Sequence, residues 1–129
     1  MIRMAVLQRQ LQLSLDLAAE CARLMTLLPG PAETAALCRD HLAHAEALTR
    51  LIGEGCPSCT AGSDLPVHVA PAPSLEHLTA LVRVARDTAR QACLTASDPG
   101  EIDLLAMITA ALAGHEVVLA GAGFQEGLQ

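Results

Sequence analysis

Histidines and cysteines at helical spacing are the side chains of this sequence best suited to chemistry. Cys38, His41 and His44 follow one another at intervals of three residues, which places them on one side of a helix. His115 lies on the apolar stripe of another predicted helix. A buried imidazole needs a hydrogen bond, a shifted pKa or a metal ion, because burying it without a partner costs about 1 to 3 kcal/mol. These four residues therefore predict a metal site inside a helical protein.

The ligand types indicate which metal such a site would prefer. Thiolate together with imidazole suits Zn or Cu(I), whereas iron is disfavoured because it calls for bridging carboxylates. The plainer interpretation stays open beside this one. In it, the histidines are core residues that hydrogen-bond to carbonyls, carboxylates or one another, and the thiols pack as small hydrophobic groups.

A second motif is Cys56-Pro57-Ser58-Cys59, which lies in a predicted loop. Two thiolates at this spacing make half of a tetrahedral zinc site, and His68, another cysteine or a second subunit could complete it. A redox role is disfavoured, because the strand and helix that flank a thioredoxin-type site are missing. A surface turn with two reduced thiols is the alternative.

Four helical segments must position these residues, and Pro, Gly and Ser clusters separate them. The helices are expected at about 2–28, 32–52, 74–96 and 99–121, with a connection at 53–73. Ser74 and the run Asp98-Pro99-Gly100-Glu101 are start signals, and Gly53 and Gly121-Ala122-Gly123 are stop signals.

Short, long and short connections suit an all-α four-helix bundle, in which two antiparallel hairpins are joined by one long Pro/Gly-rich crossover. The crossover is long enough to run the length of a helix. In this arrangement several polar side chains and thiols converge near the middle of one domain, 1–129. They are Glu20, Cys21, Cys38, His41, His44 and His115.

Composition bounds the class of protein. The chain has 129 residues, of which 52% are hydrophobic and 17% charged, with one Phe and no Trp or Tyr. These apolar residues are enough for one hydrophobic core, and a composition rich in Leu and Ala disfavours an all-β fold. A net charge of −6 disfavours nucleic-acid binding, and the absence of Lys excludes Schiff-base and P-loop lysine chemistry.

The termini and apolar runs bear on location. No secretory segment can be drawn at the N-terminus, and no run is expected to be long enough to span a bilayer. A cytoplasmic protein without membrane contact follows, and its five thiols are then expected to be reduced, buried or metal-bound rather than paired in disulfides.

A basic stripe of Arg83, Arg86 and Arg90 borders the apolar face of the third predicted helix. Such a stripe usually pairs with nearby acids such as Asp87 at a solvated edge, and the other interpretation is that it holds an anion or an acidic partner helix. The Ala-rich face of the same helix is a surface on which two copies could pack, so we expect a homo-oligomer, most simply a dimer.

The stretches Leu37–Leu48 and Leu104–His115, together with the Pro-rich crossover, resemble a small ferritin-like domain. In metal-active members, Glu-x-x-His motifs on the second and fourth helices bind two irons with single Glu residues of the other helices. His41 and His115 match the histidines, and Glu20 stands for the carboxylate of the first helix. Cys38 and Leu112 occupy the Glu positions, so the resemblance implies a bundle that is not a di-iron oxidase.

Three functions are consistent with these observations. The expected one is a metal-binding bundle that uses Cys38, His41, His44, His115 or the Cys56/Cys59 pair. The alternative is a catalytically silent dimerisation or protein-interaction module in which the CxxC forms a structural zinc clip. A helical enzyme with a histidine acid or base ranks last, because no residue can be identified as a nucleophile.

Overall fold

The structure is a computed structural model that describes residues 2–27, 32–56, 58, 66–72 and 74–128. The side chains of 2–3, 26–27, 32–34 and 122–128 lie outside this description. Four helices occur in chain order: α1 (Ile2–Leu27), α2 (Ala32–Gly55), α3 (Leu75–Thr95) and α4 (Pro99–Leu128). No strand occurs within these ranges, so the predicted all-α class and the four helices are confirmed.

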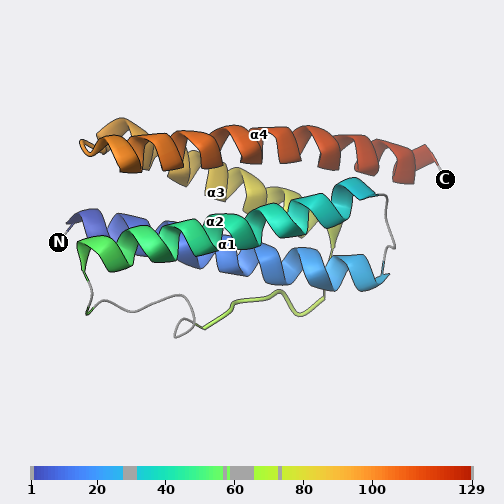
Figure 1. Ribbon diagram of the computed structural model, residues 1–129. Coiled ribbons are helices and arrows are strands. Elements are labelled where there is room, and N and C mark those ends of the chain that lie inside the picture. The colour runs from blue at the N-terminus through green and yellow to red at the C-terminus, as the bar shows by residue number, and fades with distance from the viewer. Residues whose placement is uncertain (1, 28–31, 57, 59–65, 73, 129) are drawn as a thin grey trace.

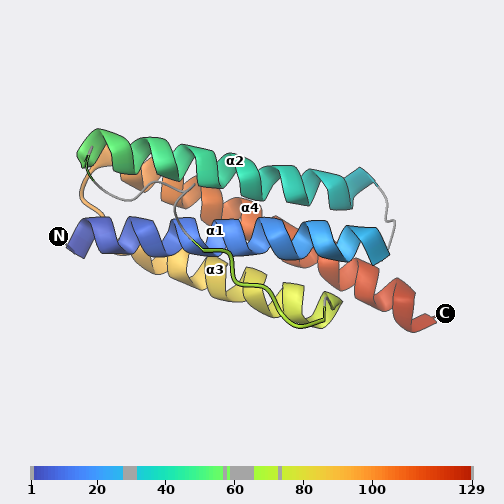
Figure 2. The same ribbon diagram turned by 90° about the horizontal axis from the view of Figure 1, so that it is seen from below.

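The helices form a bundle of two antiparallel pairs, α1 with α2 and α3 with α4 (Figure 1). α1 also packs against α3, and α4 makes a smaller contact with α2. The view from below shows part of the connection between α2 and α3 running along α1 (Figure 2). The seam between α2 and α4 is therefore the least extensive of the four helix contacts, and it is the seam that His41 and His115 approach from opposite sides.

Both predicted helix starts are confirmed by their caps. The Ser74 hydroxyl accepts a hydrogen bond from the His77 amide at 3.0 Å, at the start of α3. The Asp98 carboxylate accepts one from the Glu101 amide at 3.2 Å, with Pro99 as the first residue of α4. These side chains satisfy amide groups that have no partner within the helix.

The predicted stops at Gly53 and at Gly121-Ala122-Gly123 are wrong, because α2 continues to Gly55 and α4 to Leu128. No described glycine has a positive φ, so neither site forms the left-handed cap that glycine permits. A Cβ atom at Gly53 or Gly121 would have open space around it, so packing against other helices does not force either helix to end there. Glycine allows a helix to end but does not require it.

Polar side chains of α1 hold the described part of the connection. The buried Glu20 carboxylate accepts a hydrogen bond from the Ala70 amide and lies 3.4 Å from an Arg23 guanidinium nitrogen. Arg23 donates in turn to the Ala70 carbonyl, and Asp16 accepts from the His68 amide at 2.9 Å. The connection thereby obtains hydrogen bonds that its own irregular backbone cannot supply.

Replacing Glu20 by Ala is expected to lower the free energy of unfolding by about 1 to 3 kcal/mol, because the Ala70 amide loses its acceptor and Arg23 loses this carboxylate. Urea unfolding followed by circular dichroism measures the change. Glu46→Ala is the matched control, since Glu46 pairs with Arg50 in an exposed i,i+4 ion pair worth less than about 1 kcal/mol. Equal effects of the two substitutions would contradict this role of Glu20.

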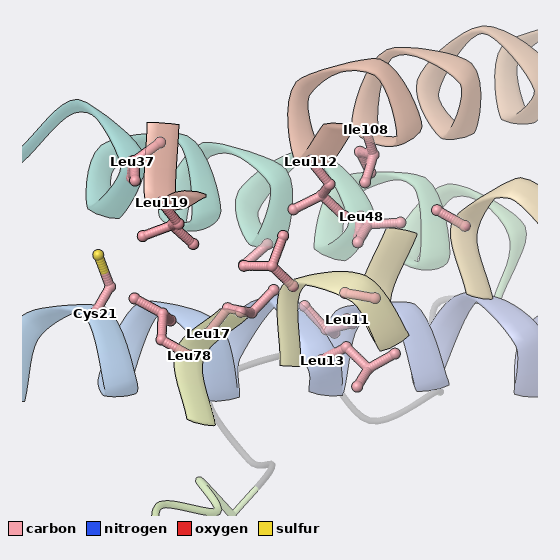
Figure 3. Packing of buried hydrophobic residues seen from close by; sticks show 14 of the residues in the cluster. Leu11, Leu13, Leu17, Cys21, Leu37, Leu48, Leu78, Ile108, Leu112 and Leu119 are labelled. Carbon is pink, nitrogen blue, oxygen red and sulfur yellow. The ribbon is translucent and has the colours of Figure 1, made fainter. Parts of the chain in front are cut away.

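The core is built mainly from Leu, with small side chains on α3. The buried residues of α3 repeat at three- and four-residue spacing, as predicted: Leu78, Val82, Ala85, Ala89 and Ala92. Figure 3 shows leucines of α1, α2, α3 and α4 meeting in one cluster. The small Ala85 lets α1 come close enough for the Gln10 amide to donate to the Ala85 carbonyl at 3.1 Å.

α4 is more apolar on its outer side than a surface helix normally is. Its segment Pro99–Gly121 is long and apolar enough to cross a membrane by length and composition, with a mean hydropathy of 1.7. The expectation that no apolar run is long enough to span a bilayer is therefore wrong for α4. Only 28% of the most apolar 18-residue stretch of this segment is buried inside the bundle. Met107, Val117 and Val118 are exposed.

Candidate metal centre between α2 and α4

Two imidazoles face each other across the seam between α2 and α4. The ring centroids of His41 and His115 lie 4.8 Å apart, with the ring planes at 86°. Both side chains are buried, with exposed fractions of 1% and 4%. The prediction that these two histidines lie inside the bundle is confirmed.

Asp40 orients the second imidazole. Nε2 of His115 lies 2.9 Å from Oδ2 of Asp40, and a carboxylate can only accept in this hydrogen bond. When His115 is neutral, its proton therefore sits on Nε2 and its lone pair on Nδ1. Metal-binding histidines commonly have this arrangement, in which a carboxylate holds the nitrogen that does not bind the metal.

His41 is held in the neutral form. Burial is the main cause that lowers its pKa from 6.5 to about 3; the neighbouring imidazoles of His115 and His44 act in the same direction, and the Asp40 carboxylate opposes them. The pKa of His44 is also lowered, chiefly by burial. Imidazole binds metal only when it is unprotonated, so His41 is ready to act as a ligand at neutral pH.

One ring nitrogen of each imidazole has no hydrogen-bond partner in the described structure. These atoms are Nδ1 of His41 and Nδ1 of His115, and both are shielded from solvent. Leaving such a nitrogen unsatisfied costs about 1 to 3 kcal/mol, so buried polar groups are normally paired. Nδ1 of His115 thus offers a lone pair, and Nδ1 of His41 lies buried beside the same seam without a hydrogen-bond partner.

His44 lies near this pair but not as close. Its ring centroid is 6.4 Å from that of His41, at an interplanar angle of 74°. No group of three or more His, Cys, Asp and Glu close enough to hold a metal ion occurs among the described residues. The described side chains therefore form a centre of two imidazoles, with a third imidazole one helical turn away.

Cys38 does not join the imidazoles, although the sequence placed them together. It forms a disulfide with Cys21 of α1, with the two Cα atoms 5.6 Å apart. Residues three apart on a helix point about 60° away from each other, so Cys38 turns toward α1 while His41 turns toward α4. The expectation that the thiols are not paired in disulfides is wrong for Cys21 and Cys38, and also for Cys56.

The CxxC motif gains no support as a zinc site. Cys56 takes part in a disulfide, and Cys59 lies outside the described residues. His68, considered as a further ligand, is exposed and has its amide hydrogen-bonded to Asp16. Cys93 is a free, half-buried thiol whose Sγ lies 3.6 Å from the Ile102 carbonyl oxygen.

Among the residues that the structure describes, the carboxylates of a di-iron centre are not assembled around His41 and His115. Glu20, expected to stand for the carboxylate of the first helix, instead binds the Ala70 amide and pairs with Arg23 and His77. On α3, Arg83 and Arg86 pair with Glu116 of α4, and Arg86 also with Asp87. This pairing is that of a solvated ionic edge, the ordinary interpretation of the basic stripe.

Two residues of chemical interest escaped the sequence reasoning. Asp40 precedes His41, and adjacent helix positions do not face each other, so its contact with His115 follows only from the packing of α2 against α4. Met25 lies four residues after Cys21 on the same face of α1, and this spacing could have identified it from the sequence.

Comparisons with protein-family models, curated proteins and solved structures find no match for this chain.

Proposed function

We propose that this protein is a metal-binding four-helix bundle that holds a zinc ion between α2 and α4, with Nδ1 of His41 and Nδ1 of His115 as its ligands. The observation that carries the proposal is the pair of buried Nδ1 atoms without hydrogen-bond partners. Rings that share one tetrahedral zinc ion at roughly 2.0–2.1 Å have centroids about 5 Å apart. The spacing of 4.8 Å between these two rings agrees with that value.

The surrounding residues support zinc rather than iron. Zinc accepts neutral imidazoles with an orienting carboxylate behind them, as Asp40 stands behind His115. Half of the Asp40 side chain is exposed, so the Nε2 side of the His115 ring lies close to solvent. His44 is the nearest further imidazole, and water can complete the coordination of zinc where protein ligands are lacking.

The same observations extend to the class of bundle. We infer that the chain is a ferritin-like domain in which the di-iron site has been replaced. His41 and His115 keep the positions of the two histidines, while Cys38 and Leu112 stand where carboxylates would be needed. Such a bundle would store, carry or be stabilised by its metal, and the incomplete carboxylate set argues against oxidation chemistry on iron.

Zinc titration of the oxidised protein tests the proposal. With the Cys21–Cys38 disulfide formed and free thiols alkylated, thiolates cannot contribute, and competition with a chromogenic zinc indicator reports the affinity. We expect one zinc per chain and at least a roughly 100-fold loss of affinity in His41→Ala and in His115→Ala. Asp40→Asn should weaken binding about 10- to 100-fold, because it removes the group that orients His115.

The control is His68→Ala, which removes an exposed imidazole of the connection and should leave zinc affinity unchanged. Circular dichroism of each variant verifies the fold, and His115→Gln serves if the Ala variant does not fold. Failure of the wild-type protein to bind zinc, or equal affinity in the wild-type protein and His41→Ala, would refute the proposal.

A dimerisation module is the second candidate, and the exposed apolar side of α4 favours it. Met107, Val117 and Val118 lie on that side, where a second copy could cover them. If the function is assembly through a zinc clip at the CxxC, Cys56→Ser should abolish zinc-dependent dimers in sedimentation, and His41→Ala should not. The metal centre proposed above gives the reverse pattern in zinc affinity.

A further inference from the structure

Three sulfur atoms from two helices meet near the end of the α1–α2 hairpin. Cys21 of α1 is fully buried and forms a disulfide with Cys38 of α2. Sδ of Met25 lies 3.2 Å from Sγ of Cys38. Figure 3 shows the Cys21 side chain pointing from α1 toward α2. Met25 follows Cys21 by four residues, so both side chains project from the same face of α1.

We propose that this sulfur cluster, defined as Cys21, Met25 and Cys38, binds one Cu(I) ion when the two cysteines are reduced, and that disulfide formation releases the ion. Two thiolates and a thioether are soft ligands, the kind that selects Cu(I) over harder ions. The cluster shares no residue with the imidazole centre, so this proposal goes beyond the zinc site and is tested separately from it.

Burial explains why such a site would be selective. Cys21 lies within the leucine core, and Leu24 and Leu37 of the same core are buried nearby on the two helices. Cys38 and Met25 are only partly buried, so the ion can enter from their side. Sγ of Cys38 lies beside two other sulfur atoms, those of Cys21 and Met25, and the side chain of Cys38 packs against the hydrophobic core. An apolar pocket with sulfur donors disfavours hydrated ions that need oxygen ligands.

The release step balances with a low-molecular-weight disulfide as oxidant. The reactants are Cu(I) held by the two thiolates, one molecule of the disulfide RSSR, and two protons. The products are free Cu(I), the Cys21–Cys38 disulfide and two molecules of RSH. The cysteine sulfurs lose two electrons, RSSR gains them, and copper keeps its oxidation state. Thiol–disulfide exchange proceeds through a mixed disulfide.

Accessibility sets the order of the exchange. Cys38 is partly exposed, so its thiolate attacks RSSR, displaces the first RS⁻ and forms the mixed disulfide. The buried Cys21 thiolate then attacks Sγ of Cys38 and displaces the second RS⁻. The two Cα atoms are 5.6 Å apart, within the usual range for a disulfide, so the helices need not move apart or together.

The test uses a full-length variant with Cys56→Ser, Cys59→Ser and Cys93→Ser, in which only Cys21 and Cys38 remain. The protein is reduced with a phosphine, and Cu(I) affinity is measured anaerobically by competition with bathocuproine disulfonate. We expect one Cu(I) per reduced chain and affinity at least roughly 100-fold lower after oxidation. Cys38→Ala should abolish binding, and Met25→Leu should weaken it about tenfold.

Matched variants and a second measurement identify the ligands. Met107→Leu changes an exposed methionine of α4 and should have no effect, and His41→Ala should bind Cu(I) like the parent. Copper K-edge absorption should show sulfur neighbours in the reduced protein. Glutathione disulfide should release Cu(I) together with two glutathione thiols per chain.

Three results would overturn the proposed Cu(I) site. They are equal Cu(I) affinity in the reduced and oxidised protein, binding that survives Cys38→Ala, and copper neighbours that are only nitrogen. Copper release without the two glutathione thiols would overturn the disulfide-linked release. Because His41→Ala leaves the sulfur cluster intact, failure of the zinc proposal would not affect any of these results.

Discussion

Lowering the pH of the metal-free protein from 7 to 5 is expected to reduce its free energy of unfolding by about 2 kcal/mol. The pKa of His41 is about 3 in the folded protein and takes its ordinary value of 6.5 when the chain unfolds. Between these values the unfolded chain binds a proton that the folded one does not. Stability is therefore fully present above about pH 6.5 and is lost as the pH falls toward 3.

The measurement is urea unfolding in the presence of a chelator, at several values between pH 5 and pH 7. His44 contributes in the same direction, since burial lowers its pKa as well. His41→Leu keeps a side chain of similar size without a titrating group, and its stability should vary less with pH over this window. A variant with the same slope as the wild-type protein would show that another group causes the loss.

Leu112→Ala is expected to cost about 3 kcal/mol of unfolding free energy, within the range for truncating a buried leucine. Leu112 is buried on α4 one turn before His115, and Figure 3 places it beside Leu48 of α2. The contact between α2 and α4 is small, so little else there can close the cavity. Leu94→Ala is the control: Leu94 is 67% exposed, and its loss should change stability by less than about 0.5 kcal/mol.

The same variant links packing to the imidazole centre. A cavity beside His115 admits water, which solvates the charged form of His41 and weakens the cause of its lowered pKa. The pH dependence of Leu112→Ala between pH 5 and 7 should therefore be smaller than that of the wild-type protein. Unfolding is followed by circular dichroism, because the chain has no Trp or Tyr. A stability loss below about 1 kcal/mol would mean that the seam repacks freely.

The sequence predicted best what depends on neighbours along the chain. Helix starts at Ser74 and Asp98 follow from local hydrogen bonds, and the burial of His41 and His115 follows from the spacing of apolar residues. Helix ends were predicted less well, because the glycines at 53 and 121 permit a stop without forcing one.

Contacts between distant segments could not be predicted in the same way. Their spacing predicted Cys38 and His41 on one side of α2, but their directions around the helix differ by about 60°. Cys38 therefore contacts α1, whereas His41 contacts α4. Glu20 was expected near the imidazoles, and its partner proved to be a backbone amide of the connection. The periodicity of a sequence does not show with which neighbouring helix or loop a polar side chain will form its hydrogen bond.

The pairing of α1 with α2 and of α3 with α4 has a consequence for how the chain reaches its native state. Each hairpin joins helices that are consecutive in the sequence, so most of its contacts are of low contact order and can form on the microsecond to millisecond scale. The contacts of α1 with α3 and of α2 with α4 are the ones that require the two halves to find each other. Closure entropy grows only slowly with the length of a loop, so the twenty or so residues between the halves delay this docking little. The rate-limiting event in folding is thus expected to be the association of two preformed hairpins.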